Sequence, residues 1–412
     1  MKIRNIIFLL MGIACIMLCS CKLSANDCKG NSVDVVADLA YCHNQVKRTL
    51  QLIENDSCML PRSINTMSDK WNMTNAYDWT SGFWPGILWY DYENTGDESV
   101  KKEAEHYTNC LADLLNPEHR GDHDLGFQFF CSFVNAYRIT GDPYYKKIAL
   151  AGADKLAAFF NPKVGTILSW PHMEKEKGWP HNTIMDNMMN LDLLFWAARN
   201  GNNKDFYRMA ESHARVTMQH QFRPDYTNYH VAIYDTVSGN FIKGLTNQGY
   251  SDESCWSRGQ AWAIYGFTMV YRETGNKEYL RFAEKLADAY LTRLPDDYVP
   301  YWDFDAPDIQ NQPKDVSAAA VCASALLELS SLEDNKAMSE YYWQAAEHML
   351  NSLASDYYRC GNQKTAFLLH ATGNMPAGYE IDASINYADY YYIEALHRYK
   401  TLKRINTLSE KQ

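Results

Sequence analysis

The sequence predicts an all-α fold, a six-hairpin (α/α)6 barrel that carries a small strand-rich insertion. Three observations along the 412 residues favour this fold. A turn containing glycine recurs, the helix before each turn is more apolar than the helix after it, and no segment has the composition of a linker. Covered inner helices and outer helices with one polar face would produce this alternation. An open helical solenoid would have the same pattern, because periodicity does not show closure.

The turns and helices are expected in a fixed order. The turns are Asn94-Thr95-Gly96-Asp97, Ile139-Thr140-Gly141-Asp142, Arg199-Asn200-Gly201-Asn202 and Glu273-Thr274-Gly275-Asn276. We expect each glycine to end a helix in the left-handed conformation and Asp or Asn to begin the next. The more apolar helices are expected over residues 125–137, 185–198, 260–272 and 317–329, with a charged helix over 278–293. A turn near Asp334 and a C-terminal helix over 385–399 bring the total to about six pairs.

The strand-rich insertion is expected around residues 229–244. Apolar and polar residues alternate from Tyr229 to Asp235, and Ser238-Gly239-Asn240 has the composition of a turn. This short segment interrupts an otherwise helical pattern.

The first 20 residues are expected to be an export signal and not part of the fold. Lys2 and Arg4 precede an apolar run over residues 6–19, which has the length of a signal peptide and is too short to span a bilayer. The run ends Leu18-Cys19-Ser20-Cys21, similar to a bacterial lipoprotein cleavage box with Cys21 as the lipidated residue. The sequence therefore predicts one domain over residues 21–412, exported to the periplasm or outer membrane and held to a membrane only through a lipid anchor.

Composition narrows the class of partner. The net charge of −11 argues against nucleic acid, which is bound through clustered Lys and Arg. The 11 Trp and 29 Tyr residues suit stacking on sugar rings, although core packing is their commoner use. We expect no cofactor and no metal. A metal held by His119, Asp122, His123 and Asp124 is the alternative to a polar loop that opens a helix.

Seven of the eight cysteines outside the signal fall into two groups. Cys28, Cys42 and Cys58 could pair with one another near the N-terminus. Cys110, Cys131, Cys255 and Cys322 lie in apolar helical runs and are expected to be buried small hydrophobic side chains.

Two carboxylates stand where apolar helices begin. Asp186 lies in Ile184-Met185-Asp186-Asn187-Met188-Met189, and Asp124 lies in His123-Asp124-Leu125-Gly126-Phe127. Burial of an aspartate without partners raises its pKa and costs free energy, so both residues need an explanation. Paired carboxylates of this kind cleave glycosidic bonds.

The starts of the inner helices would lie on one rim of a barrel. Asp124, Asp186 and the Arg258-Gly259-Gln260 helix start are therefore expected to face one pocket. Several residues near these starts could line it: Asp78, Trp79, Trp84, Trp170, Trp179, Trp256, Trp262 and Trp302.

Five motifs resemble the unsaturated glucuronyl hydrolases of glycoside hydrolase family 88, over most of the chain after the signal. They are Asp78-Trp79-Thr80-Ser81-Gly82-Phe83-Trp84-Pro85-Gly86, His123-Asp124-Leu125-Gly126-Phe127, Met185-Asp186-Asn187-Met188-Met189-Asn190, Trp256-Ser257-Arg258-Gly259-Gln260-Ala261-Trp262 and Tyr387-Ala388-Asp389-Tyr390-Tyr391. The resemblance implies a six-hairpin barrel that removes the unsaturated uronate which polysaccharide lyases leave at the non-reducing end of oligosaccharides, including those of glycosaminoglycans. It implies Asp186 as general acid/base and Asp124 as a second essential carboxylate. It also implies a set of substrate-site residues: His230, Gln248, Trp256, Arg258 and Trp262, with Trp79 and Trp170.

The chemistry of such a substrate requires only one acid. A 4,5-unsaturated uronate is an enol ether, so Asp186 would protonate C4 and water would add to the cation at C5. Apolar neighbours such as Met188 and Met189 would raise the Asp186 pKa. The charge of Asp124 would raise it further and stabilise the cation.

Alternatives remain for single residues and for the whole protein. Asp124 could be a helix N-cap, Arg258 could form an internal salt bridge in place of binding the substrate carboxylate, and His230 could be a satisfied buried residue. The protein could instead be an unsaturated rhamnogalacturonyl hydrolase acting on pectin fragments, a glycan-binding lipoprotein without catalysis, or an inverting glycosidase of saturated sugars.

Overall fold

The helices expected from the alternating pattern are present in the computed structural model, which describes residues 32–53 and 58–409. Ser32 is the first residue of one compact unit. The expected export signal over residues 1–20, the lipidation site Cys21 and Cys28 lie outside the described residues. Within the described ranges, no helix is long and apolar enough to cross a membrane.

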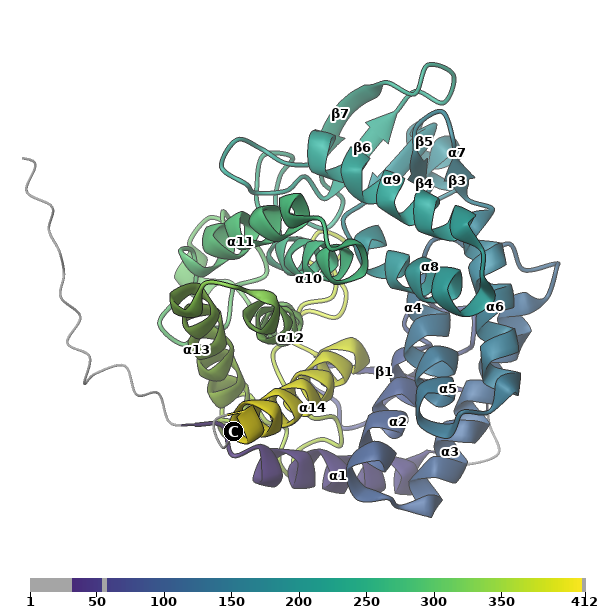
Figure 1. Ribbon diagram of the computed structural model, residues 1–412. Coiled ribbons are helices and arrows are strands. Elements are labelled where there is room, and N and C mark those ends of the chain that lie inside the picture. Colours follow the sequence, from purple (N-terminus) through teal and green to yellow (C-terminus); the bar gives the residue numbers. More distant parts are fainter. Residues whose placement is uncertain (1–31, 54–57, 410–412) are drawn as a thin grey trace, which may run out of the picture. The chain divides into compact units, whose positions relative to one another are not determined.

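A layer of buried helices lies around a common centre (Figure 1). These helices are α2 (Phe83–Thr95), α4 (Leu125–Phe129) with α5 (Asn135–Thr140), α8 (Asn187–Gly201), α10 (Ser257–Thr274), α12 (Val316–Leu332) and α14 (Asn386–Ser409). Neighbours contact each other in the pairs α2–α14, α14–α12, α12–α10, α10–α8 and α8–α4, and α5 contacts α2. Burial explains the apolar sequences, because every residue of α12 from Val316 to Ser330 is buried.

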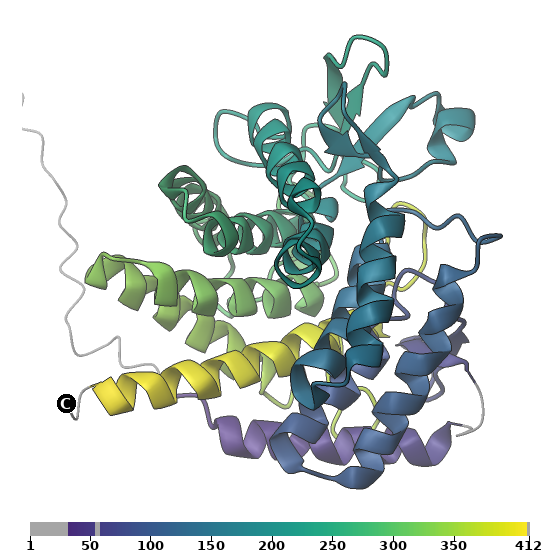
Figure 2. The same cartoon turned by 45° about the vertical axis from the view of Figure 1, so that its right-hand side comes forward.

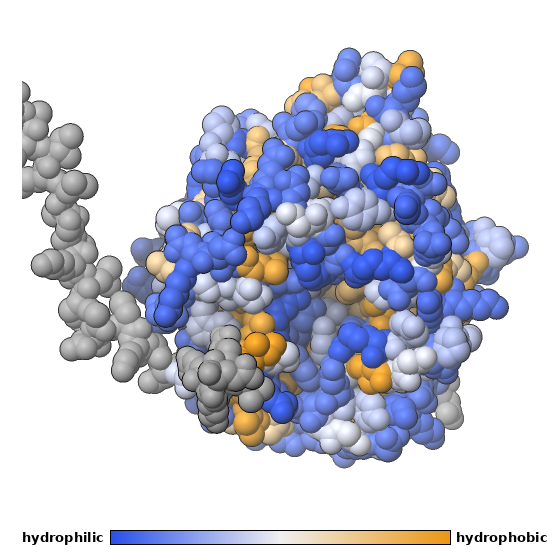
Figure 3. Space-filling model, in the orientation of Figure 1, coloured by the Kyte–Doolittle hydropathy of each residue, from blue (hydrophilic) through white to orange (hydrophobic). Residues whose placement is uncertain are grey.

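A second layer of helices covers the first on its outer side (Figure 1). Its members are α1 (Val35–Leu52), α3 (Glu98–Cys110), α6 (Pro143–Ala157), α9 (Lys204–His220), α11 (Lys277–Leu291) and α13 (Lys336–Leu353). Only one stripe of α9 is buried, consisting of Phe206, Ala210, His213, Ala214 and Thr217. This helical spacing leaves a polar face toward water, as the alternating pattern predicts. The face seen in Figure 3 is accordingly mostly hydrophilic.

The turns between paired helices follow the expected chemistry, with one correction. Gly96, Gly141 and Gly275 adopt left-handed φ angles of 69°, 71° and 66° at the ends of their helices. At the third turn the prediction for Gly201 is wrong: α8 includes Gly201, and Asn202 takes the left-handed position with φ 54°. Asparagine tolerates this conformation better than other residues with a side chain, so it can replace glycine there.

Three small sheets accompany the helices. The expected insertion is confirmed by β6 (Val231–Tyr234) and β7 (Phe241–Leu245), and β5 (His181–Ile184) joins them in the order β5-β6-β7. All pairs are antiparallel, with His181 opposite Tyr234 and Val231 opposite Leu245. The other sheets are β2-β1-β8, built from β1 (Leu60–Ile64), β2 (Asn72–Thr74) and β8 (Ser384–Ile385), and β3-β4, built from β3 (Phe160–Asn161) and β4 (Thr166–Ile167). Three further short elements are η1 (Leu111–Leu115), α7 (Met173–Lys177) and η3 (Ile309–Asn311).

Two helical features depart from the sequence pattern. Helix α1, which the turn pattern did not reveal, packs against α14, so the first and last helices of the unit are neighbours (Figure 2). The helix expected over 125–137 contains a π-helical segment, η2 (Phe130–Val134), between α4 and α5. Side chains of Ser132 and Asn135 donate to the carbonyls of Gln128 and Cys131 there, and such bonds compete with the regular helical ladder.

The cysteine predictions need correction. Cys58 forms a disulfide with Cys110, which joins the segment before β1 to the end of α3. Cys42 is instead a free, buried thiol, as are Cys131, Cys255 and Cys322. Pairing between residues 52 positions apart depends on how β1 and α3 pack, which local sequence does not encode.

Candidate active site

A cavity of about 150 Å³ lies where several buried helices begin. Asp124 and Asp186 immediately precede α4 and α8, Trp79 precedes α2, and Tyr387 lies in the first turn of α14. The structure therefore brings both carboxylates of the sequence analysis into one cavity. The full lining is Arg62, Trp79, Asp124, Trp170, Ile184, Asp186, Asn247, Gln248, Gly373, Asn374, Tyr379, Glu380 and Tyr387.

Asp186 is a nearly buried carboxyl at the point where β5 passes into α8. Asp186 is 7% exposed, and its side chain makes no capping hydrogen bond to α8. Burial raises the pKa of Asp186 to about 7, although the positive charge of Arg258 opposes the shift. The Oδ2 atom has no hydrogen-bond partner, so it is available to a ligand in the cavity. A carboxyl with this pKa can both give and take a proton near neutral pH.

Asp124 occupies the equivalent position before α4, and it does not cap the helix with its side chain. Burial raises the pKa of Asp124 well above its usual range, and the negative charges of Asp122 and Asp186 raise it further. The side chain of Asn190, 3.5 Å from Oδ1, opposes the shift. The charge of Asp186 thus acts on Asp124, so the two carboxyls do not ionise independently.

His230 lies beside Asp186 and is buried. Its Nδ1 accepts the backbone N–H groups of Asn247 and Gln248 at 3.2 and 3.1 Å, which places the imidazole proton on Nε2. That Nε2 is 3.6 Å from Oδ2 of Asp186. Burial, followed by the charge of Arg258, lowers the pKa of His230 well below its usual value, so the ring is neutral. Gln248 reaches the cavity and donates its side-chain amide to the Gly373 carbonyl at 3.2 Å.

Tryptophans contribute less to the cavity than their number in the sequence indicates. Trp79 and Trp170 line it. The Asn182 side chain holds Trp170 in place, because it accepts the Trp170 backbone N–H and donates to the Trp170 carbonyl, each at 3.0 Å. The expectation that the others line the pocket is wrong for the cavity found here. They are buried in the core: Trp84, Trp179, Trp256, Trp262 and Trp302. Flat apolar side chains near helix starts thus mostly pack between elements.

Arg258 lies behind the cavity wall and is only 1% exposed. Its Nη1 forms an ion pair with Asp315 at 2.6 Å, and its guanidinium also donates to the Thr372 and Gly373 carbonyls at 2.6 and 2.5 Å. The internal salt bridge left open by the sequence is therefore present. Through Gly373, Arg258 fixes backbone that lines the cavity, and its charge reaches Asp186.

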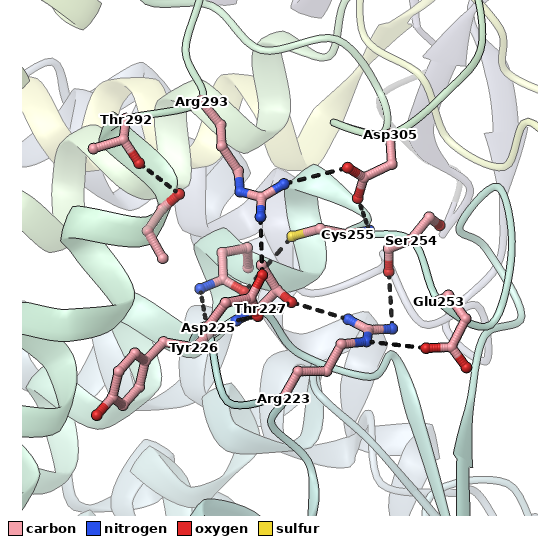
Figure 4. A network of polar contacts seen from close by, with 12 residues as sticks. Arg223, Asp225, Tyr226, Thr227, Glu253, Ser254, Cys255, Thr292, Arg293 and Asp305 are labelled. Carbon is pink, nitrogen blue, oxygen red and sulfur yellow. Dashed lines mark hydrogen bonds and ion pairs between the residues drawn. The ribbon is translucent and has the colours of Figure 1, made fainter.

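The segment before α10 is held by a network of arginines (Figure 4). Arg223 donates to the carbonyls of Asp252 and Ser254 at 2.6 and 3.1 Å. Arg293 bridges Asp225 and Asp305, and Asp305 accepts the Cys255 backbone N–H at 2.8 Å. These bonds fix the approach to Trp256 and Arg258, so the network positions the wall of the cavity from outside.

The sequence analysis did not identify two charged residues at the cavity wall, Arg62 and Glu380. Arg62 on β1 pairs with Glu380 at 2.8 Å and with Asp78. Arg62 and Glu380 both line the cavity, although 318 positions separate them in the chain. A single arginine within the apolar run Leu60-Pro61-Arg62-Ser63-Ile64 was the available signal.

Comparison with known families identifies the chain. The family described as Glycosyl Hydrolase Family 88 matches residues 54–402. The chain belongs to glycoside hydrolase family 88.

Relatives of this family 88 chain are similar over most of their length. It is 42% identical over 347 residues to an unsaturated glucuronyl hydrolase of Formosa agariphila, covering 83% of this chain and 85% of the relative. It is 33% identical over 337 residues to an unsaturated chondroitin disaccharide hydrolase of Streptococcus pyogenes serotype M1, covering 81% and 84%. The crystal structure of an unsaturated glucuronyl hydrolase specific for heparin matches with a TM-score of 0.85 at 41% identity, covering 90% of this chain and 98% of that one.

Proposed function

We propose that this family 88 protein removes 4,5-unsaturated uronate from the non-reducing end of glycosaminoglycan-type oligosaccharides, as an unsaturated glucuronyl hydrolase. One observation carries the proposal: the buried carboxyl of Asp186 has a pKa of about 7 and an unpartnered oxygen at the cavity. A heparin-specific relative and a chondroitin disaccharide hydrolase support the substrate class.

The reaction begins with proton transfer from Asp186 to C4 of the sugar. The electrons of the C4=C5 double bond form the new C–H bond, and the ring oxygen shares the positive charge left on C5. Water then adds to C5 and gives a proton to the Asp186 carboxylate, which restores the acid. The C5 hemiketal opens to a ketone, and the former ring oxygen becomes a hydroxyl on C1. Because C1 also carries the second sugar, it is now a hemiacetal carbon, and its collapse releases that sugar. No attack at the anomeric carbon is needed.

Asp124 supplies the negative charge that the cation needs. While Asp186 holds its proton, its negative charge is absent and does not add to the effects that raise the pKa of Asp124. The developing charge on C5 then stabilises the Asp124 carboxylate and is stabilised by it. We assign substrate contacts to Trp79, Trp170 and Gln248, which line the cavity. His230, Trp256, Arg258 and Trp262 would support these groups from behind.

We further propose that the two helical layers form a closed (α/α)6 barrel. The contacts of α14 with both α12 and α2 support closure, because an open solenoid would leave its terminal helices without such neighbours. A crystal structure in which α2 and α14 were apart would contradict this arrangement.

We also infer that residues 1–20 direct export and that Cys21 carries a lipid anchor. The Cys58–Cys110 disulfide supports export, since disulfides persist in oxidising compartments. We expect the protein to fractionate with membranes with an acylated Cys21, detectable by mass spectrometry, and Cys21→Ser to release it. Membrane-bound Cys21→Ser protein would contradict the anchor.

The pH dependence of kcat/KM follows from the Asp186 pKa. Asp186 must be protonated to act as the acid, and its pKa is raised to about 7. Activity is therefore expected to persist below about pH 7 and to fall about tenfold per pH unit above it. Initial rates between about pH 5 and about pH 9 check this. A decline that already begins near the ordinary carboxyl pKa would contradict the assignment.

A panel of unsaturated disaccharides tests the substrate class. Hydration removes the conjugation between the double bond and the carboxylate, so loss of ultraviolet absorbance reports turnover. We expect turnover of disaccharides made by glycosaminoglycan lyases to exceed turnover of those made by pectin lyases. The reverse order would favour the rhamnogalacturonyl alternative, and binding without turnover would favour a glycan-binding protein.

A further inference from the structure

His123, the residue directly before Asp124, is completely buried and has a defined tautomer. Its Nδ1 lies 2.9 Å from Nδ2 of Asn190. The Asn190 Oδ1 accepts the Phe127 backbone N–H at 2.7 Å, so Nδ2 is the end of the amide that donates. His123 Nδ1 is therefore an acceptor, and the imidazole carries its proton on Nε2.

The protonated Nε2 of His123 faces the carboxyl of Asp124. It lies 3.5 Å from Oδ1 and has no hydrogen-bond partner. Burial lowers the pKa of His123 to about 3, so the ring is a neutral donor. A buried N–H group without a partner is unfavourable and calls for a functional explanation. Hydrogen bonds in ligand-free active sites are often long and shorten when substrate binds.

His230 has the same relation to Asp186. Its Nδ1 is occupied by two backbone donors, and its Nε2 faces Asp186 Oδ2 at 3.6 Å, with neither of these two atoms hydrogen-bonded. Each carboxyl of the site thus faces one neutral imidazole donor whose tautomer is fixed on its far side. The two histidines come from different parts of the chain, so the repetition is not a consequence of local sequence.

We propose that His123 is a positioning residue of the reaction, which holds Oδ1 of Asp124 through Nε2–H when the sugar is bound and leaves Oδ2 for the substrate. This inference rests on the proposed function. Asn190 fixes the tautomer of His123, and Gly126 lets Asn190 approach α4, because a Cβ atom at residue 126 would lie 2.3 Å from the Asn190 Cβ. The motif around Asp124 therefore contains both the carboxyl and the parts that orient it.

Two substitutions at His123 separate positioning from packing. In His123→Asn the shorter amide keeps an acceptor near Nδ1 but removes the donor at Nε2, whereas in His123→Gln an amide donor reaches the Nε2 position. We expect kcat of His123→Asn to fall about 30-fold with KM changed less than about threefold, and His123→Gln to keep at least about a third of the wild-type kcat. If His123 served only in packing, the amide donor of His123→Gln would not restore kcat.

His213 on α9 provides the matched control. It resembles His123 in three ways: it is completely buried, its Nδ1 accepts a backbone N–H, that of Ile167 at 2.9 Å, and its Nε2 has no hydrogen-bond partner. Unlike His123 and His230, it pairs with no carboxylate in the described part of the chain. We expect His213→Asn to keep kcat within about threefold of wild type. Equal kcat in folded His123→Asn and His213→Asn would overturn the inference, as would equal losses in His123→Asn and His123→Gln.

A second variant keeps the inference testable if His123→Asn does not fold. Asn190→Asp retains an acceptor for Phe127 but removes the donor to His123 Nδ1, so the tautomer is no longer fixed. We expect a similar loss of kcat, and an unchanged kcat would overturn the inference. Wild-type protein inactive on every unsaturated disaccharide would refute the proposed function, whereas active wild type with unaffected His123 variants would refute only this role.

Discussion

Asp186→Asn is expected to lower kcat/KM on unsaturated disaccharides by about 10³-fold while the protein stays folded. The amide has the shape of the carboxyl but has no acidic proton to deliver to C4 and cannot take one from water. The nearby imidazole of His230 is neutral and buried, so it does not offer an acidic proton in place of Asp186. The measurement is initial rate by loss of ultraviolet absorbance.

The same variant is expected to be more stable than wild type at alkaline pH. The folded-state pKa of Asp186 is about 7 against an ordinary value of 3.8, so the folded protein holds this proton more tightly than the unfolded chain does. The resulting stability is fully present below about pH 4 and is lost as pH rises through about 7. Above that pH the buried charge costs the wild type up to about 4 kcal/mol, at about 1.4 kcal/mol per pKa unit.

Thermal unfolding at about pH 5 and about pH 8 checks this second effect. We expect the Tm advantage of Asp186→Asn to grow with pH. Asp192→Asn is the matched control, because Asp192 is buried on the same helix but pairs with Arg272 at 2.8 Å. Loss of the Asp192 carboxylate leaves Arg272 without this partner, so Asp192→Asn should lower Tm and leave kcat within about threefold of wild type. A Tm for Asp186→Asn that fell with rising pH as steeply as that of the wild type would contradict the raised pKa.

Asp124→Asn is expected to lower kcat by about 10²-fold. Asparagine is as good an N-cap as aspartate, so this change leaves any helix-capping contribution in place. What it removes is the ability to carry negative charge beside the cation at C5. Steady-state kinetics and a thermal melt on one preparation check the prediction. A folded Asp124→Asn protein with wild-type kcat would show that Asp124 has no role in the chemistry.

The sequence contained enough local information to predict the helical hairpins and the cavity carboxylates. Asp124 and Asp186 stood out because a charged residue at the start of an apolar helix is unusual, and the structure places both in one cavity. The strand pair β6-β7 followed from alternation and a turn. Each of these signals lies within a few consecutive residues.

Features that depend on packing between distant residues were not predictable in this way. The Cys58–Cys110 disulfide and the Arg62–Glu380 ion pair join segments that only the complete fold brings together. Strand β8 has two residues, too few to show period-two alternation, and burial along β1 does not alternate. The pattern also could not tell a tryptophan facing the cavity, such as Trp170, from one in the core, such as Trp262.

The central claim is that Asp186 protonates an alkene carbon, and a matched pair of disaccharides tests it most directly. The two would share the second sugar and the linkage and differ only in whether the terminal uronate has the C4=C5 double bond. We predict release of the second sugar from the unsaturated member alone, because hydration requires the double bond. Comparable release from the saturated member would contradict the account, since it would show attack at the anomeric carbon by an ordinary glycosidase mechanism.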